Sequence, residues 1–87
     1  MYATPTRPMT QAELDLICQV WADNGSDDPT DQWLELWDGG DADEYPEQRD
    51  AILAVATAVG LETSMKKGVL MVQKTQQLHD EIGQKWA

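Results

Sequence analysis

The fold class depends on the stretch DDPTDQWLELWD, residues 27–38. Asp28 followed by Pro29 is typical of a helix N-cap with proline in the first turn, and Asp31 adds a carboxylate near the positive end of the helix dipole. A glycine pair at 39–40 offers the stop. The pattern therefore predicts a short helix, and its apolar side chains are Trp33, Leu34, Leu36 and Trp37.

Longer helices are expected on both sides of this stretch. Thr10 and Glu13 have the spacing of a capping box and precede an apolar stripe, which predicts a helix over 11–23. The segment 46–58 begins with proline and has almost no polar face, so we expect a helix at the centre of the core. A fourth amphipathic helix is predicted over 75–86, where large apolar residues recur every fourth position.

The sequence of residues 61–73 is compatible with two structures, a β-hairpin and a helix. A β-hairpin fits because Gly68 can adopt a positive φ and the following residues, 69–72, form a short apolar run. A helix starting at Ser64 would instead place Gly68 in its interior, at a cost of roughly 1 kcal/mol. We therefore favour the hairpin.

These elements predict a mainly α fold, with α+β as the alternative. The expected architecture is a small single-domain bundle of three to four helices with a short β-hairpin near 61–73, in the element order of a winged helix. Residues 1–8 contain two prolines and no periodic apolar pattern, so they are interpreted as a flexible lead-in. Residues 9–87 are expected to form one compact domain, because a chain of 87 residues is too short for two cores.

The net charge of the chain restricts the classes of function that are expected. The chain carries 16 acidic and 6 basic side chains, a net charge of −10, and 13 of the acids lie between Glu13 and Asp50. Such a surface repels phosphate, so direct binding to DNA, RNA or an anionic membrane is not expected. Lys66 and Lys67 would lie at a wing tip, but the helix that would enter the DNA groove lacks base-reading side chains. A protein with a basic, nucleic-acid-binding surface is the predicted partner.

Motifs for catalysis or metal binding are missing from the sequence. Cys18 and His79 are the single cysteine and histidine, which excludes a zinc site with three or four such ligands. The acidic clusters do not have the spacing of a calcium-binding EF-hand. We therefore expect no enzymatic activity, no metal and no cofactor. The lone cysteine and the lack of a long apolar run predict a cytoplasmic protein without a membrane span.

The preferred hypothesis is a non-enzymatic inhibitor that imitates the phosphate array of nucleic acid and binds the basic groove of a nucleic-acid-handling protein. Two tryptophans would serve as apolar anchors. In general character the chain resembles the small acidic inhibitors that viruses of bacteria use against host defence or transcription enzymes. The predicted partner-binding residues are Asp27, Asp28, Asp31, Trp33, Glu35, Trp37, Asp38, Asp41, Asp43, Glu44 and Glu47.

The alternative hypothesis is a small helical adaptor or assembly module. It would act through the Trp-bearing helix at 28–38 or by self-association, including formation of a homodimer, and the acidic surface would then serve solubility. A chain without Phe also needs its tryptophans for burial. The sequence therefore leaves open whether Trp33 and Trp37 lie in the core or at an interface.

Overall fold

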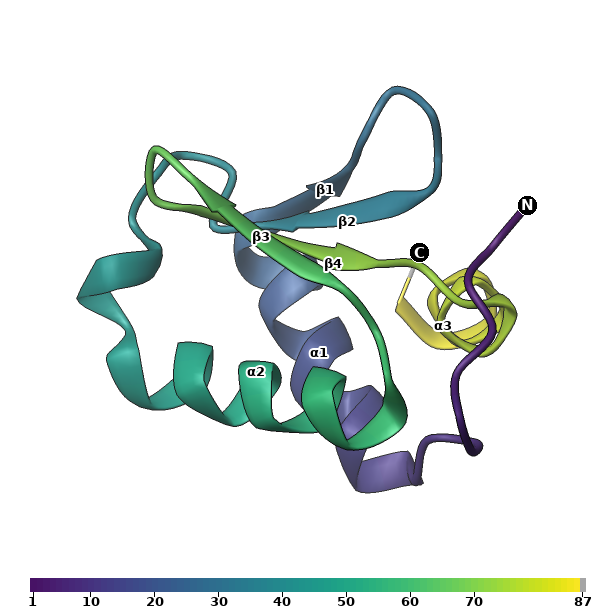
Figure 1. Ribbon diagram of the computed structural model, residues 1–87. Helices are drawn as coiled ribbons and strands as arrows, with labels where there is room; N and C mark the ends of the chain where they lie inside the picture. The colour runs from purple at the N-terminus through teal and green to yellow at the C-terminus, as the bar shows by residue number, and fades with distance from the viewer. Residues whose placement is uncertain (87) are drawn as a thin grey trace.

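The computed structural model describes residues 1–86; Ala87, the last residue of the expected domain, lies outside them. Within residues 1–86, three α-helices pack on one face of a four-stranded antiparallel sheet (Figure 1). In chain order the elements are α1 (Gln11–Asn24), β1 (Gly25–Asp27), β2 (Trp33–Leu36), the 3-10 turn η1 (Ala42–Glu44), α2 (Pro46–Val59), β3 (Thr63–Lys66), β4 (Val69–Gln73), α3 (Gln76–Glu81) and the π-helical turn η2 (Ile82–Trp86).

The mainly helical bundle predicted from the sequence is wrong, because the fold is α+β. The helix expected over 28–38 does not form, and β2 occupies its place between β1 and β4. Burial along β2 gives the reason. Leu34 and Leu36 are fully buried, whereas the residues beside them, Trp33 and Glu35, remain partly exposed. This alternation with a period of two is that of a strand with one face on the core. The winged-helix-like order is also wrong, because the strands β1 and β2 stand between α1 and α2 where a second helix was expected.

Asp28 closes a turn between β1 and β2 instead of capping a helix. Its carboxylate accepts hydrogen bonds from the Thr30 hydroxyl at 2.6 Å and from the backbone N–H groups of Gln32 and Trp33, each at 2.9 Å. Asp31 in the same turn has a φ of 58°. A left-handed residue is incompatible with a right-handed helix, so the helix is interrupted where the sequence pattern favoured it.

The hairpin favoured for residues 61–73 is present as β3 and β4. Lys67 and Gly68 form its two-residue turn with φ values of 53° and 78°, as the tightest hairpin turns require. The sheet order is β1-β2-β4-β3, so β4 pairs with β2 on one side and β3 on the other. A local turn signal and an apolar run were sufficient to identify this part of the sheet.

Helix α1 begins at the capping box that Thr10 and Glu13 predicted. The Arg7 guanidinium bonds to the Glu13 carboxylate at 2.8 Å and, together with the backbone N–H of Thr10, lowers the pKa of that carboxylate to about 2. Helix α2 differs from expectation. It buries Ile52, Ala56 and Val59 and exposes several alanines, so it covers the edge of the core and does not run through its centre.

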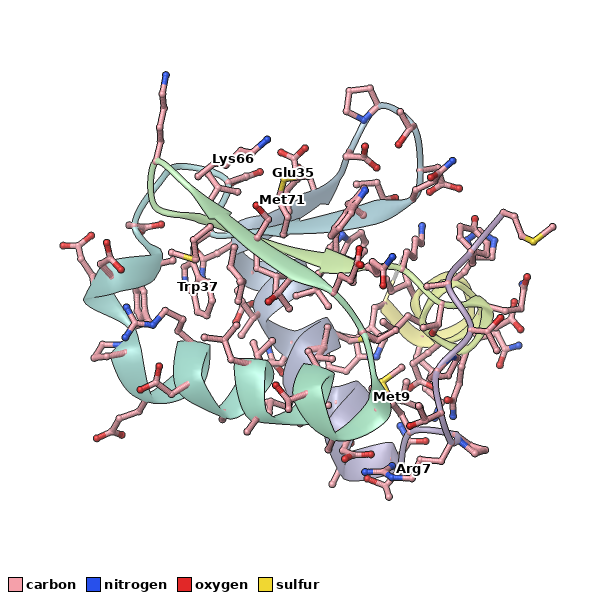
Figure 2. All side chains as sticks on the ribbon, in the orientation of Figure 1. Arg7, Met9, Glu35, Trp37, Lys66 and Met71 are labelled. Carbon is pink, nitrogen blue, oxygen red and sulfur yellow. The ribbon has the colours of Figure 1, made fainter. Side chains whose placement is uncertain are left out.

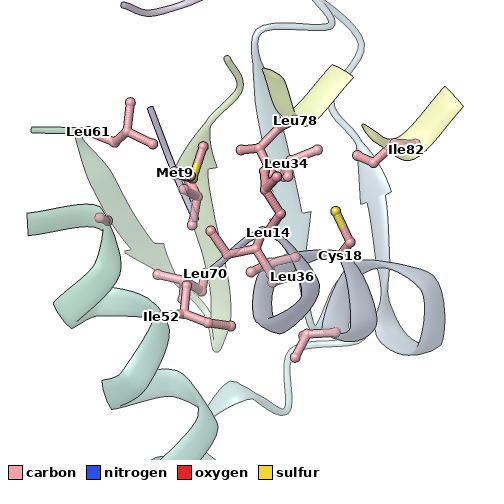
Figure 3. Close-up of a cluster of buried hydrophobic side chains, with 14 of the residues drawn as sticks. Met9, Leu14, Cys18, Leu34, Leu36, Ile52, Leu61, Leu70, Leu78 and Ile82 are labelled. Carbon is pink, nitrogen blue, oxygen red and sulfur yellow. The ribbon is translucent and has the colours of Figure 1, made fainter. Parts of the chain in front are cut away.

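The core lies between the sheet and the helices (Figure 3). The inner face of the sheet supplies leucine and valine side chains that contact α1 from one side, while α2 and α3 close the flanks. Met9, just before α1, is also buried there. The buried apolar residues of the sheet and its neighbouring loops are Leu34, Leu36, Trp37, Ala42, Leu61, Leu70 and Val72.

The N-terminal segment crosses the molecule beside α3 (Figure 1). The N–H of Ala3 donates to the carbonyl of Lys74 at 2.9 Å, and the N–H of Thr6 donates to that of Val59 at 2.9 Å. Ala3 also forms an isolated parallel bridge with Thr75. These bonds connect residues 1–8 to the residue after β4 and to the end of α2. That residues 1–8 are flexible stays a prediction.

Two glycine backbones meet where the β3–β4 turn touches the loop after β2. Gly40 and Gly68 both have positive φ, at 88° and 78°, and a Cβ at Gly68 would collide with the Gly40 carbonyl group. We expect Gly68→Ala to lower the free energy of unfolding by about 1–3 kcal/mol, measured by urea denaturation. Gly39→Ala is the matched control, because its Cβ would meet open space. A Gly68→Ala variant as stable as the control would contradict this close approach.

Candidate functional site

The predicted partner-binding residues are distributed over separate parts of the molecule. Three of them, Asp27, Asp28 and Asp31, lie in or beside the β1–β2 turn. Trp33 and Glu35 lie on the face of the sheet that the helices leave open. Trp37 is in the core, and the remaining five follow it in a continuous stretch of chain: Asp38, Asp41, Asp43, Glu44 and Glu47.

This last group belongs to residues 38–50, which we call the acidic segment. It carries six carboxylates against one guanidinium, a net charge of −5. Arg49 pairs with Asp43 at 2.8 Å and with Asp50 at 3.2 Å. No ion pair with a described residue is found for the other four acids, which are exposed or half-buried: Asp38, Asp41, Glu44 and Glu47.

Backbone hydrogen bonds fix the acidic segment against the sheet. The N–H of Gly40 donates to the Trp37 carbonyl at 2.8 Å, and the N–H of Ala42 donates to the Gly68 carbonyl at 2.9 Å. Ala42 itself is fully buried. The segment thus lies beside the β3–β4 turn, as Figure 1 shows, and its carboxylates face solvent from a defined position.

Trp37 anchors the start of this segment from inside. Its side chain is fully buried, and its ring stacks on that of Tyr45 with a centroid distance of 5.8 Å and an interplanar angle of 16°. Figure 2 shows it below the sheet, on the side of the helices. Of the two roles that the sequence left open for Trp37, burial in the core is the one the structure has. The adaptor hypothesis also loses the Trp-bearing helix on which it relied.

The acids of the β1–β2 turn are engaged within the protein. Lys74 is only 2 % exposed, and its Nζ lies 2.7 Å from Asp31 Oδ1 and 3.4 Å from Asp27 Oδ1. The Tyr2 hydroxyl donates to Asp31 at 2.5 Å and lies 3.0 Å from His79 Nδ1. The hydrogen bonds from Lys74 and then Tyr2 lower the pKa of Asp31.

The sequence did not reveal this network, because Lys74 is 43 residues from Asp31 and its burial depends on the strand register. Burial lowers the pKa of Lys74, but the hydrogen bond that Lys74 donates to Asp31 and the charges of Asp27 and Asp31 outweigh this effect and raise the pKa overall. The ammonium group is therefore charged at neutral pH. These two acids consequently offer less free negative charge than the sequence implied.

The open face of the sheet contains a shallow depression of about 600 Å³. Figure 2 shows Glu35 and Met71 projecting from this face, on the side away from the helices. Sequence reasoning had selected Trp33 and Glu35 but missed the residues that β3 and β4 bring beside them. The depression is lined by Trp33, Glu62, Thr63, Ser64, Lys66 and Met71.

Two features of the described residues concern metal binding and thiol chemistry. Within residues 1–86 there is no group of three or more His, Cys, Asp or Glu side chains that could hold a metal ion. Cys18 is fully buried, and burial raises the pKa of its thiol to about 12, so it is not a thiolate at neutral pH. No helix within residues 1–86 has the length and apolar character needed to cross a membrane.

Comparison with known proteins finds no matching family model, no matching curated protein and no matching solved structure. The function is therefore argued from the two surfaces described above, the acidic segment and the open face of the sheet.

Proposed function

We propose that the protein is a non-enzymatic binding module that docks on the basic surface of a nucleic-acid-handling protein and blocks the groove that takes nucleic acid. The acidic segment supports this proposal. Its four carboxylates that form no ion pair with a described residue lie within ten residues of chain. They lie on the start of α2 and on the loop before it, which the Ala42 N–H joins to the β3–β4 turn. A fixed array of uncompensated negative charge has the sign and density that a phosphate-binding groove attracts.

Electrostatic attraction of this kind acts mainly on encounter and on the choice of partner. Opposite charges steer the two proteins together and like charges exclude unsuitable surfaces. Lys66 and Lys67 are at the β3–β4 turn, beside the acidic segment. Neither lysine forms an ion pair with a described residue. Their positive charge limits the acidic surface on one side, which favours one orientation of the partner.

The cellular compartment belongs to the same proposal. The single thiol is buried and has no second cysteine to pair with, which suits a reducing cytoplasm. Basic nucleic-acid-handling proteins are available there.

Affinity capture from a lysate of the source organism tests the proposal. The immobilised protein is exposed to lysate at about 50 mM and about 300 mM salt, and the retained proteins are identified. We expect a basic nucleic-acid-binding protein whose affinity falls at least about tenfold between the two conditions, because salt screens exposed charges. We also expect that this partner releases nucleic acid when the acidic protein binds.

Two results would contradict the proposal. One is a partner whose affinity hardly changes with salt. The other is a ternary complex in which the partner holds nucleic acid and this protein at the same time, since the two ligands are proposed to share one groove.

A further inference from the structure

The open face of the sheet presents its side chains in rows that run across the strands. In the first row Trp33 on β2 pairs with Gln73 on β4, and Gln73 is bonded to Glu62 through its backbone N–H at 3.1 Å and its side-chain oxygen at 2.9 Å. In the second row Glu35 lies opposite Met71. The first two rows thus combine a large aromatic ring, a thioether and two carboxylates.

The positive charge on this face is at the other end. Lys66 lies opposite Val69 in the third row. Each row is two residues along the strand from the next. Glu62 lies just before β3 and Lys66 at its end, so their Cα atoms are about 13 Å apart in extended backbone. Neither Glu62 nor Glu35 forms an ion pair with a described residue. The first two rows are therefore acidic and aromatic, while the third is basic.

We propose that the depression beside Trp33 takes an arginine side chain of the basic partner. This inference rests on the proposed function and adds to it the chemical group that the open face recognises. The guanidinium plane stacks on the indole of Trp33, with its N–H groups directed to Glu62, and its methylene stem lies over Met71. Lys66 repels a second cation from the far end of the same depression.

Arginine fits this arrangement better than other occupants. A guanidinium is planar, so it stacks on an aromatic face while it donates two parallel hydrogen bonds to a carboxylate. A lysine ammonium is a compact, strongly hydrated charge and does neither as well. A nucleotide phosphate would be repelled by Glu35 and Glu62. A second copy of this chain would bring another net charge of −10 onto the same surface, which opposes close approach at low salt.

Two nonapeptides of equal length and equal charge provide the test, one with three arginines and one with three lysines at the same positions. Binding is followed by the indole Nε1–H signals in nitrogen–proton NMR spectra of the full chain. The indole nitrogens of Trp21, Trp37 and Trp86 are buried, so Trp33 is the tryptophan expected to respond. We expect the arginine peptide to shift the Trp33 signal and to bind at least about fivefold more tightly than the lysine peptide.

Two variants and a control make the test specific. Trp33→Leu and Glu62→Gln should each remove the preference for arginine. Trp33→Leu has no reporter indole, so its affinities are measured from backbone amide signals, whereas Glu62→Gln leaves the indole and the sheet intact. Asp80→Asn removes one exposed charge on α3, away from the open face, and should leave the preference unchanged. Circular dichroism establishes that each variant is folded before its affinity is compared.

The outcomes separate this inference from the proposed function. Equal affinities of the two peptides, with shifts confined to amides of residues 38–50, overturn the arginine site and leave the electrostatic proposal standing. Failure of both peptides to bind at low salt overturns both. Dimerisation in sedimentation experiments that Trp33→Leu abolishes would assign the open face to a second copy of the chain and overturn the arginine site.

Discussion

Trp37→Ala is expected to lower the free energy of unfolding by about 3–5 kcal/mol, a large part of the total stability of a small domain. The ring is fully buried and stacks on Tyr45, so its removal leaves a cavity that the neighbouring helix and loop cannot fill completely. Urea denaturation with linear extrapolation measures the loss. We expect a lower midpoint and a less cooperative transition if the start of the acidic segment detaches.

Trp33→Ala is the control for this experiment. Trp33 lies on the open face of the sheet and is partly exposed, so its truncation should cost about 1 kcal/mol or less. The two tryptophans are four positions apart in the sequence, and replacing either by alanine removes the same number of atoms. Similar losses for both variants would show that the open face is packed against something, and would contradict the burial difference between them.

The second large effect is expected from neutralising the acidic segment. Replacing Asp38, Glu44 and Glu47 by the corresponding amides should weaken binding to the captured basic partner by about 100-fold at low salt and remove most of the salt dependence. These side chains are exposed and form no ion pair with a described residue, so the fold should be retained and relief of repulsion should slightly stabilise it.

A matched variant distinguishes local charge from net charge. Asp15→Asn, Asp23→Asn and Asp80→Asn together change the net charge by the same amount at exposed positions on α1 and α3. Each of these carboxylates accepts a hydrogen bond from a glutamine one turn earlier, and an amide oxygen can accept the same bond. We expect less than about a tenfold loss of affinity. Equal losses from both triple variants would mean that overall charge, and not the acidic segment, governs binding.

Local signals explain which parts of the fold were predictable. The capping box at Thr10 and the turn at Lys67 and Gly68 act within a few residues, so the sequence identifies α1 and the β3–β4 hairpin. Strand β2 has only four residues, too few for a period of two to outweigh the Asp28-Pro29 signal of a helix start. Strand β1 is Gly-Ser-Asp and has low strand propensity; it is extended because β2 lies beside it.

Of the two candidate surfaces, one could be predicted from the sequence and the other could not. The acidic segment is continuous in sequence, so its charge could be recognised without coordinates. The depression on the open face combines residues from β2, β3 and β4, and its composition follows from strand order, which the sequence did not provide. The burial of Lys74 beneath two aspartates likewise depends on the β2–β4 register, in which Trp33 lies opposite Gln73.

The contact between Gly40 and Gly68 bears on the thermodynamics of association. It joins a loop from the first half of the chain to a turn from the second half, and the bond from the Ala42 N–H to the Gly68 carbonyl locks the two together. For the basic partner proposed above, the spacing of the carboxylates would be set before the encounter. We therefore expect little loss of backbone entropy on formation of that complex, so that a larger share of the attraction between opposite charges contributes to affinity.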